Sequence, residues 1–383
     1  MRPRLKPLAE QTIVITGGSS GIGLATARAA AARGAAVVIA ARNGEALEKI
    51  AAEIRASGGR VATCEADVAN ETAVERIAET AVTAFGGFDT WVNDAAAATY
   101  GEVEKLPLED HRRVFDVNYF GLVSGSIIAA RHLRQRGGGA IINVGSVLSD
   151  RAVVMQGAYC ASKFAIKGFT DTLRMELEAD GAPISVTLIQ PAGIHTPYPE
   201  HARNQMDQPP RVPPVLYAPE LVADAILFAA ENRKRALVVG GNGALISWGG
   251  KFAPRLMDLA TEAFGARAQK APGQPGDPAM RDNLYAPKKD GQVEGNQDFF
   301  VRRTSLWLEA QKRPVVATAI ISAVTAAAMI ASARGRRSGS DARPATGSAT
   351  ATAAPRPVRV DAAGSSERAG AAQIDREPAL LDA

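Results

Sequence analysis

The sequence has few cysteine, histidine and aromatic residues. Its 383 residues include two cysteines, four histidines and 5% aromatic side chains. Cys64 and Cys160 have no second cysteine or histidine at the spacing of a zinc site, and one pair of cysteines cannot form a disulfide framework. Composition therefore excludes a disulfide-stabilised secreted protein and a zinc protein, and we expect no bound metal and a reducing compartment.

We expect no signal peptide, and the central part of the sequence has no basic block. The basic N-terminal residues pass through Pro7 into a strand-like run, without an apolar core or a cleavage site. The formal net charge is +4, and the excess of basic residues falls in Met1–Lys6 and Arg302–Arg337. Because the central region carries no basic groove, we expect no nucleic-acid partner.

What the sequence does have is a regular alternation of short β-branched runs with amphipathic, alanine-rich segments. The runs are apolar throughout, which is typical of strands buried on both faces of a parallel sheet. Helical patterns such as Glu45–Arg55, Glu71–Phe85 and Leu221–Glu231 separate them. We therefore predict an α/β fold, a Rossmann-like doubly wound parallel sheet of about seven strands with a C-terminal helical extension. The predicted strands are Thr12–Thr16, Ala36–Ala41, Val61–Glu65, Phe88–Asn93, Ala140–Val144, Ile184–Gln190 and Ala236–Val239.

Changes in composition divide the rest of the chain. A Gly-, Pro- and Gln-rich stretch at 266–298 indicates a linker. The uncharged run Val315–Ala333 has the length of a membrane span and basic residues on both flanks, although its alanine content leaves a buried or amphipathic helix as the alternative. The predicted regions are an N-terminal tail at 1–10, a Rossmann-like domain at 11–245, a helical extension and linker at 246–298, a basic-flanked helix at 299–337 with a transmembrane anchor at 315–333, and a disordered tail at 338–383.

The first predicted strand runs directly into a glycine-rich turn and then into an alanine-rich helix. Glycines here allow a tight turn, close approach of the backbone to a pyrophosphate and close packing of helix on strand, while the helix N-terminus offers amide donors. A simple turn is the alternative, but the placement between a first strand and a first helix favours a dinucleotide site. The residues assigned to cofactor binding in this turn are Gly17, Ser19, Ser20, Gly21, Ile22 and Gly23.

The ends of the second and third strands bear on the choice of cofactor. Ala41 stands where NAD-dependent sites commonly place an acid for the ribose hydroxyl, and Arg42 follows it. Because a guanidinium pairs with a 2′-phosphate, we predict a preference for NADP(H), with NAD(H) as the alternative. Asp67 and Val68 follow the third strand, where the Asp67 carboxylate can accept a hydrogen bond from the adenine amino group or cap the next helix.

Three further residues suit proton transfer. Lys163 follows Tyr159 by one helical turn, within a predicted helix at Gln156–Ala179, so the two side chains share a face. An adjacent ammonium stabilises the phenolate and lowers the pKa of a tyrosine from about 10. Ser146, at the end of a predicted strand, can hydrogen-bond a substrate oxygen. Together these residues supply what hydride transfer between a carbinol and a nicotinamide needs.

In this order, the motifs resemble those of the short-chain dehydrogenase/reductase family over roughly residues 10–245. The resemblance implies an oxidoreductase with a seven-stranded parallel sheet, in which Tyr159 is the acid/base and Lys163 binds the nicotinamide ribose and lowers the Tyr159 pKa. It also implies that Asn118 holds a water in a proton relay and that Asn93 and Thr196 contact the cofactor. The residues that carry the resemblance are Thr16–Gly23, Asn93, Asn118, Ser146, Tyr159 and Lys163.

Two segments depart from the family pattern. Asp94 and Ala96 belong to an Asn-Asp-Ala-Ala sequence where Asn-Asn-Ala-Gly is usual, and Pro191–Thr196 replaces the usual Pro-Gly after the sixth strand. Neither change removes a proton-transfer group. Both can alter cofactor affinity, because glycine often marks a close backbone approach.

No residue names the substrate. Selectivity should come from a long loop at Pro197–Pro219, a loop at Val147–Gly157 and the segment after Gly101, where single Met and Tyr residues either line an apolar pocket or pack locally. The chemistry specifies a secondary alcohol or its ketone, and a membrane anchor would favour lipophilic ones. Nearby, His195 is interpreted as a loop residue and Cys160 as a small packed residue.

We therefore predict an NADP(H)-dependent oxidoreductase that interconverts a carbonyl and a secondary alcohol on a small molecule. An NAD-linked alcohol dehydrogenase is the first alternative. A nucleotide-binding regulatory protein without turnover is the second, although such proteins normally lose the tyrosine or the lysine. The catalytic domain is expected in the cytoplasm, where NADPH is available, and on a membrane if 315–333 is an anchor. The resemblance further implies a homo-oligomer through the helices at Asp110–Arg134 and Gln156–Ala179.

Overall fold

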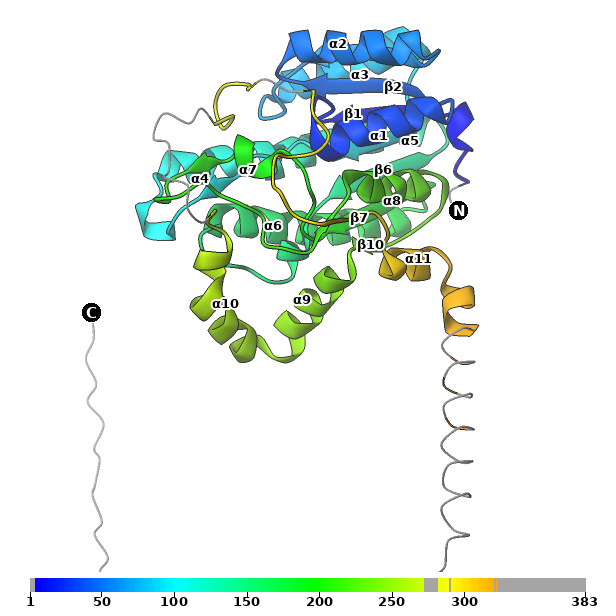
Figure 1. The fold of residues 1–383 in the computed structure, drawn as a ribbon. Helices are drawn as coiled ribbons and strands as arrows, with labels where there is room; N and C mark the ends of the chain where they lie inside the picture. Colours follow the sequence, from blue (N-terminus) through cyan, green and yellow to red (C-terminus); the bar gives the residue numbers. More distant parts are fainter. Residues whose placement is uncertain are drawn as a thin grey trace, which may run out of the picture. The chain divides into compact units, whose positions relative to one another are not determined.

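The centre of the molecule is a seven-stranded sheet. The computed structural model describes residues 4–271, 282–288 and 291–319 together with 322, 325 and 329, and the residues through Ser322 form one compact unit. The strand order is β10-β7-β6-β4-β1-β2-β3, and each neighbouring pair is parallel (Figure 1). This arrangement confirms the predicted fold class. The strands are β1 (Thr12–Thr16), β2 (Ala36–Ala41), β3 (Arg60–Glu65), β4 (Thr90–Asn93), β6 (Gly139–Val144), β7 (Ile184–Pro191) and β10 (Ala236–Val239).

Helices cover both faces of the sheet, which is why the central strands are apolar at successive positions rather than at alternate ones. The strands β1, β4, β6 and β7 are buried along their whole length. One face packs against α1 (Gly21–Ala32), α2 (Gly44–Ala56) and α8 (Pro219–Glu231). The other face packs against α3 (Glu71–Phe85), α4 (Leu108–Phe115), α5 (Gly121–Gln135) and α6 (Gly157–Ala179).

Local sequence signals set where these helices begin and end. The side chains of Asn43 and Asn70 accept hydrogen bonds from main-chain N–H groups in the first turns of α2 and α3. Gly86 ends α3 in the left-handed conformation with φ 73°, which a glycine adopts without strain. The asparagine before α2 lies two residues after β2 ends, and the asparagine before α3 lies five residues after β3 ends, so both βα turns are short.

A π-helical turn, Asp116–Phe120, joins α4 to α5. After this turn α5 lies very close to the sheet, because a Cβ added to Gly125 would lie 2.4 Å from the Asn93 side-chain oxygen and 2.8 Å from the indole nitrogen of Trp91. π-helical turns inside α-helices often occur at functional sites, and this one contains Asn118.

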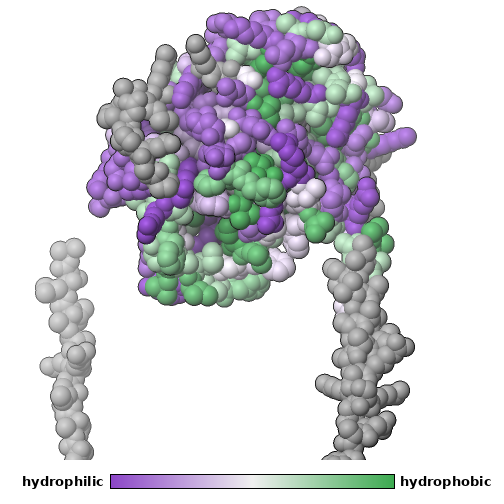
Figure 2. Space-filling view, viewed as in Figure 1, coloured by the Kyte–Doolittle hydropathy of each residue, from purple (hydrophilic) through white to green (hydrophobic). Residues whose placement is uncertain are grey.

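A helical extension follows the sheet. It consists of α9 (Gly241–Phe252), α10 (Pro254–Ala268) and α11 (Leu306–Lys312). Figure 2 shows hydrophobic side chains gathered over α9 and α10. The large apolar side chains exposed on these two helices are Leu245, Trp248, Phe252, Leu256, Leu259 and Phe264.

Two segments that the sequence predicts to be loop or linker are more ordered in the structure. The stretch Pro197–Pro219 contains a helical turn, α7 (Tyr198–His201), and the short strands β8 (Arg203–Asn204) and β9 (Leu216–Tyr217). β8 pairs with β5 (Thr99–Tyr100), and β9 pairs with β11 (Val301–Arg302). Residues 282–288 and 291–302, which we name the strap, include the end of the predicted linker and pack against the domain through the buried Leu284.

The predicted membrane anchor falls mostly on residues that the structure does not describe, and the predicted tail at 338–383 lies entirely outside the described residues. Among the residues that are described, the structure contains no helix with the length and apolar character of a membrane span. The anchor stays a prediction from the sequence.

Candidate active site

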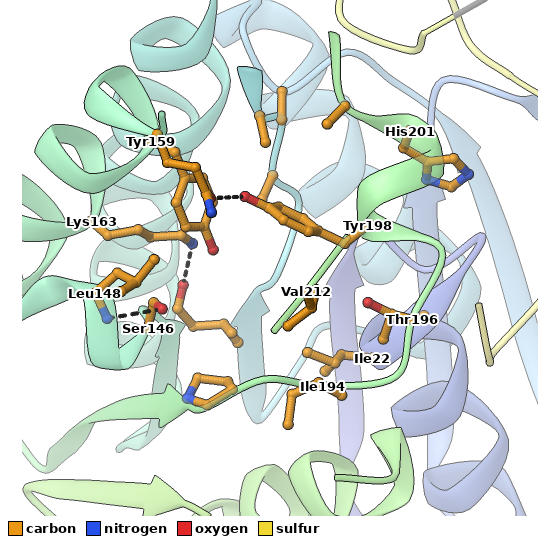
Figure 3. Close-up of a pocket in the computed structure, with 18 of the residues that line it drawn as sticks. Ile22, Ser146, Leu148, Tyr159, Lys163, Ile194, Thr196, Tyr198, His201 and Val212 are labelled. Atoms are coloured by element: carbon orange, nitrogen blue, oxygen red, sulfur yellow. Dashed lines mark hydrogen bonds between the residues drawn. The ribbon is translucent and has the colours of Figure 1, made fainter. Parts of the chain in front are cut away.

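A cavity of about 530 Å³ opens at the carboxyl ends of β1, β4, β6 and β7. The strand order runs in opposite directions on the two sides of β1, and parallel sheets bind ligands at such a switch point because the βα turns separate there. The glycine turn lines one part of the cavity, and Ser146, Tyr159 and Lys163 line another (Figure 3). The fold therefore brings most of the glycine turn together with Ser146, Tyr159 and Lys163 around one space.

The glycine turn is shaped by close backbone contacts. Gly17 has φ +74°, and a Cβ on it would lie 2.9 Å from the backbone of Ala95. A Cβ on Gly23 would lie 2.2 Å from the carbonyl oxygen of Gly17. Ser19, Ser20, Gly21 and Ile22 lie between them and line the cavity. The turn thus leaves main-chain groups at the N-terminus of α1 facing the cavity, as a pyrophosphate site requires.

The predicted adenosine-binding residues also line the cavity. Arg42 lies at the end of β2 and donates to the main-chain carbonyls of Asn283 and Leu284, the latter at 3.3 Å. Asp67 accepts from the Ala69 N–H at 3.0 Å and pairs with Arg113 at 2.5 Å, and Val68 lies beside it. Arg42 therefore lines the cavity, and its guanidinium is hydrogen-bonded to the strap.

Tyr159 and Lys163 lie one turn apart near the start of α6 and face the cavity (Figure 3). The Lys163 ammonium lies 5.4 Å from the centroid of the Tyr159 ring and donates to the Val144 carbonyl at 2.9 Å. The Ser146 hydroxyl hydrogen-bonds Tyr159 and accepts from the Leu148 N–H at 3.0 Å. All three predicted proton-transfer residues meet at one end of the cavity.

Burial controls the protonation of this group. It raises the pKa of Tyr159, the nearby Cys160 thiol adds to the effect, and the hydrogen bond from Ser146 opposes it. The direction is opposite to the one that the sequence predicts, because desolvation by burial is the largest cause of the shift. The phenol is therefore protonated at neutral pH in this structure.

Asp94 and Lys163 form the charged pair of the cavity. Burial raises the pKa of Asp94 to about 7, against the opposing charge of Lys163 and a hydrogen bond with the backbone of Gly23. Burial also lowers the pKa of Lys163 to about 8, and the Asp94 carboxylate opposes this change. The departure at Asp94 thus places a titratable group near enough to Lys163 for the two charges to influence each other.

Asn118 is buried in the π-helical turn. Its side-chain oxygen accepts from the Ala97 N–H at 2.7 Å, and its amide donates to the Ala97 carbonyl and to the Ser162 hydroxyl, both at 3.0 Å. These bonds tie the helix to the segment after β4. The side chain is used for structure, and it does not line the cavity.

Asn93 is likewise placed in the interior and does not line the cavity. Its side-chain amide donates to the Ser126 hydroxyl at 3.0 Å and to the Asn143 oxygen at 2.9 Å, and its oxygen accepts from the Trp91 indole at 2.8 Å. The Asn93 side chain therefore faces the interior of the domain and not the cavity. Thr196, in contrast, lines the cavity, and its methyl group would lie 3.3 Å from a Cβ on Gly21.

The side chains of His195 and Cys160 both lie outside the lining of the cavity. The His195 ring nitrogen lies 3.0 Å from the Gln297 carbonyl of the strap, so its side chain points toward the strap. Cys160 is buried, and burial raises the pKa of its thiol. Neither residue lines the cavity.

The far end of the cavity includes two helices, α9 and α10, that the sequence does not single out. Ile246 on α9 and several residues of α10 face this end. Gln156, next to the start of α6, accepts a hydrogen bond from the Tyr198 hydroxyl at 2.7 Å and donates to Gln269 at 2.5 Å, just beyond α10. The hydrogen bond between Gln156 and Gln269 thus joins the end of α10 to the start of α6. The lining residues of α10 and its end are Ala260, Thr261, Phe264, Gly265, Ala268 and Gln269.

Comparisons with known proteins agree with this geometry. A sequence model described as short chain dehydrogenase matches residues 11–207. An uncharacterised oxidoreductase of Bacillus subtilis, YxnA, is 45% identical over 325 residues, which is 84% of this chain and 91% of that protein. That similarity extends well beyond the length of the family model.

Solved structures share the fold. L-sorbose reductase from Gluconobacter frateurii, solved with NADPH and L-sorbose, is 27% identical with a TM-score of 0.54, and the match covers 60% of this chain and 95% of that one. A 3-ketoacyl-(acyl-carrier-protein) reductase from Brucella melitensis, solved with NADH, is 26% identical with a TM-score of 0.55, covering 62% of this chain and 99% of that one. The chain therefore belongs to the short-chain dehydrogenase family, and it is an oxidoreductase that acts between CH–OH and C=O groups with a nicotinamide cofactor.

Proposed function

We propose that this protein is an NADP(H)-dependent carbonyl reductase in which Tyr159 donates the proton to the substrate oxygen. The observation that carries the proposal is the meeting of Ser146, Tyr159 and Lys163 across one cavity from the glycine turn. An NAD-linked alcohol dehydrogenase is the second candidate, because the same residues serve the reverse direction.

The cofactor, when bound, supplies or accepts the hydride. The close contacts of Gly17 and Gly23 fit a pyrophosphate cradle, since a Cβ at either position would collide with the backbone. Arg42 lines the cavity and carries a guanidinium that can pair with a 2′-phosphate, and position 41 is an alanine instead of an acid. These two positions support NADP(H) over NAD(H).

The proton steps fall to the protein. A buried, protonated Tyr159 can act as an acid toward a carbonyl oxygen, and Ser146 can hold that oxygen by its hydroxyl. The Lys163 ammonium, close to the ring, stabilises the phenolate that remains after the proton leaves. Because the Asn118 side chain is already bonded to Ala97 and Ser162, a relay water would bind a group other than this side chain.

The substrate is a small ketone or secondary alcohol with an apolar body. Val153, Val212 and Ile246 line the far end of the cavity, with Pro213 and Phe264 beside them. Apolar walls with few polar groups favour lipophilic substrates, because desolvating a polar group without a partner is costly.

A homo-oligomer through α5 and α6 is part of the proposal. These helices expose the large apolar side chains Ile127, Phe164 and Met175, and Phe120 lies just before α5. Apolar side chains gathered on a surface commonly mark an interface. Size-exclusion chromatography with light scattering tests this, and a monomer at micromolar concentration would contradict it.

The first experiment is a fluorescence titration with NADPH and NADH, followed by a panel of ketones and secondary alcohols on the wild type and on Tyr159→Phe. We expect NADPH binding in both proteins and a loss of turnover in the variant of about 10²–10⁴-fold, the size of acid/base contributions. Turnover that survives in Tyr159→Phe would overturn the assignment of Tyr159. Binding without turnover on the whole panel would favour a regulatory protein instead.

A further inference from the structure

The strap lies outside the part of the chain that the family model covers, which ends at residue 207. Its first part is fixed at the adenosine end of the groove. Leu284 is 0% exposed, and the carbonyl of Leu284 accepts from Arg42 at 3.3 Å and from Arg113 at 3.0 Å. Asp282 pairs with Arg203 at 3.0 Å. The strap therefore begins as a fixed wall of the groove.

The strap then runs along the glycine turn. The Gly291 N–H donates to the Ser19 carbonyl at 2.9 Å, and the Gly21 N–H donates to the Gln292 carbonyl at 2.9 Å. The second bond uses an amide donor in the first turn of α1 and places a carbonyl oxygen beside it. Because these first-turn amides and the positive end of the helix dipole attract anions, the strap lowers the pull of α1 on a pyrophosphate.

At the opposite lip the strap contacts the segment after β7. The Asn296 N–H donates to the Glu200 carboxylate at 2.8 Å. Gly295 lies so close to Thr196 that an added Cβ would stand 2.5 Å from the Thr196 carbonyl oxygen. The strap thus contacts Arg42, which follows β2, and Glu200, which lies in α7.

Lys288 is a cation of the strap that lines the cavity. Its main-chain carbonyl accepts a hydrogen bond from the side-chain amide of Asn43, just before α2, at 3.1 Å. Its Nζ donates to the main-chain carbonyl of Glu200, in α7, at 2.8 Å. The half-buried side chain lines the cavity. An ammonium has three N–H donors, and one neutral carbonyl accepts only one of them.

We propose that Lys288 binds the pyrophosphate of the dinucleotide, so that the strap is part of the cofactor site. The inference rests on the proposed binding of a nicotinamide dinucleotide. Arg42 stands at the end where a 2′-phosphate would lie, whereas the Lys288 main chain is bonded to Asn43 and its ammonium donates to Glu200 in α7. An ammonium beside a phosphate oxygen forms a charge-assisted hydrogen bond. Such a bond is stronger than the neutral hydrogen bond that the Gly21 N–H could make to a phosphate if the strap did not occupy it.

The test measures dissociation constants of NADPH and NADH for the full chain and three variants. Lys288→Gln keeps an N–H donor for Glu200 but removes the charge, and Lys288→Arg keeps the charge. Lys251→Gln removes a charge from the exposed surface of α9 and is the matched control. We expect Lys288→Gln to bind both cofactors about tenfold more weakly, Lys288→Arg to stay within about twofold of wild type, and the control to match wild type.

The salt dependence separates charge from a mere latch. Added salt should weaken cofactor binding more in the wild type than in Lys288→Gln, because screening acts on the charge that the variant lacks. Wild-type affinity of Lys288→Gln for both cofactors would overturn the inference while leaving the proposed function intact. So would a loss confined to NADPH, which would assign Lys288 to the 2′-phosphate. If the wild type binds neither cofactor, the proposed function itself fails.

Discussion

The cavity has an inner wall and an outer wall that differ in origin. The inner wall consists of the turns at the carboxyl ends of the strands and the start of α6. The outer wall consists of α9, α10, the strap and part of the segment Pro197–Pro219. On the inner wall, function depends on close backbone approach and on fixed spacing along a helix, and both leave marks in the sequence. On the outer wall, ordinary side chains and main-chain carbonyls form the surface, and these leave none.

The largest effect on cofactor affinity is expected on the inner wall, from Gly23→Ala. The added Cβ would lie 2.2 Å from the Gly17 carbonyl oxygen, so the turn must shift. Overpacking of roughly 1–3 kcal/mol corresponds to a loss of NADPH affinity of up to about 100-fold. Gly168→Ala is the matched control, since a Cβ there on α6 meets nothing within 4 Å. Fluorescence titration measures both, and equal affinities would remove the glycine turn from the cofactor site.

A smaller effect is expected from Arg42→Asp, at the point where the inner wall meets the strap. The new carboxylate repels a 2′-phosphate and can accept from the ribose hydroxyl of NADH. Roughly 2 kcal/mol of lost charge-assisted bonding gives a shift of about thirtyfold in the ratio of NADPH to NADH affinity. Arg42→Gln, which keeps a donor for the strap carbonyls, should weaken NADPH without improving NADH. An unchanged ratio in Arg42→Asp would refute the assignment of Arg42.

On the outer wall, Ile246→Ala should raise the KM for an apolar substrate by about tenfold. The truncation removes part of the apolar surface of the cavity, at about 0.8 kcal/mol for each buried CH₂ group. NADPH affinity should be unchanged, because Ile246 lies away from the glycine turn. The neighbouring Leu245, 69% exposed, gives the control variant Leu245→Ala. Steady-state kinetics that show equal KM values in the two variants would exclude α9 from the substrate site.

The smallest effect concerns pH. The Asp94 carboxylate raises the pKa of Lys163, which burial holds at about 8. In Asp94→Asn this support is lost, so the ammonium deprotonates at a lower pH and the alkaline limb of the pH–rate profile moves to lower pH, by less than about one unit. An alkaline limb that stays in place would show that Asp94 does not act on Lys163.

The fold could be predicted from the sequence because strands buried on both faces are continuously apolar and the intervening helices are amphipathic. The places of the glycine turn, Ser146, Tyr159 and Lys163 around one cavity follow from the same pattern. The direction of the Tyr159 pKa could not be predicted, because it depends on burial by segments distant in the sequence. The Asn93 side chain faces inward because it hydrogen-bonds Trp91, Ser126 and Asn143. This could not be predicted either, because Ser126 and Asn143 are distant in the sequence.

The outer wall shows a different limit. A composition rich in glycine and proline indicates a lack of regular secondary structure, and the strap indeed has little. It does not indicate whether the segment packs. One buried side chain, Leu284, together with main-chain bonds to Arg42, Arg113 and Ser19, holds the strap in place. None of these contacts follows a periodic pattern that a sequence could display.

The π-helical turn at Asp116–Phe120 makes chain length a constraint of its own. Removing one residue from this turn would restore regular α-helical hydrogen bonding and rotate α5 by about 100° relative to α4. Gly125 would then no longer face Trp91, and a larger side chain would take its place against the sheet. Insertions and deletions of a single residue in this stretch should therefore be selected against as strongly as substitutions of Tyr159, even though the composition of the helix would hardly change.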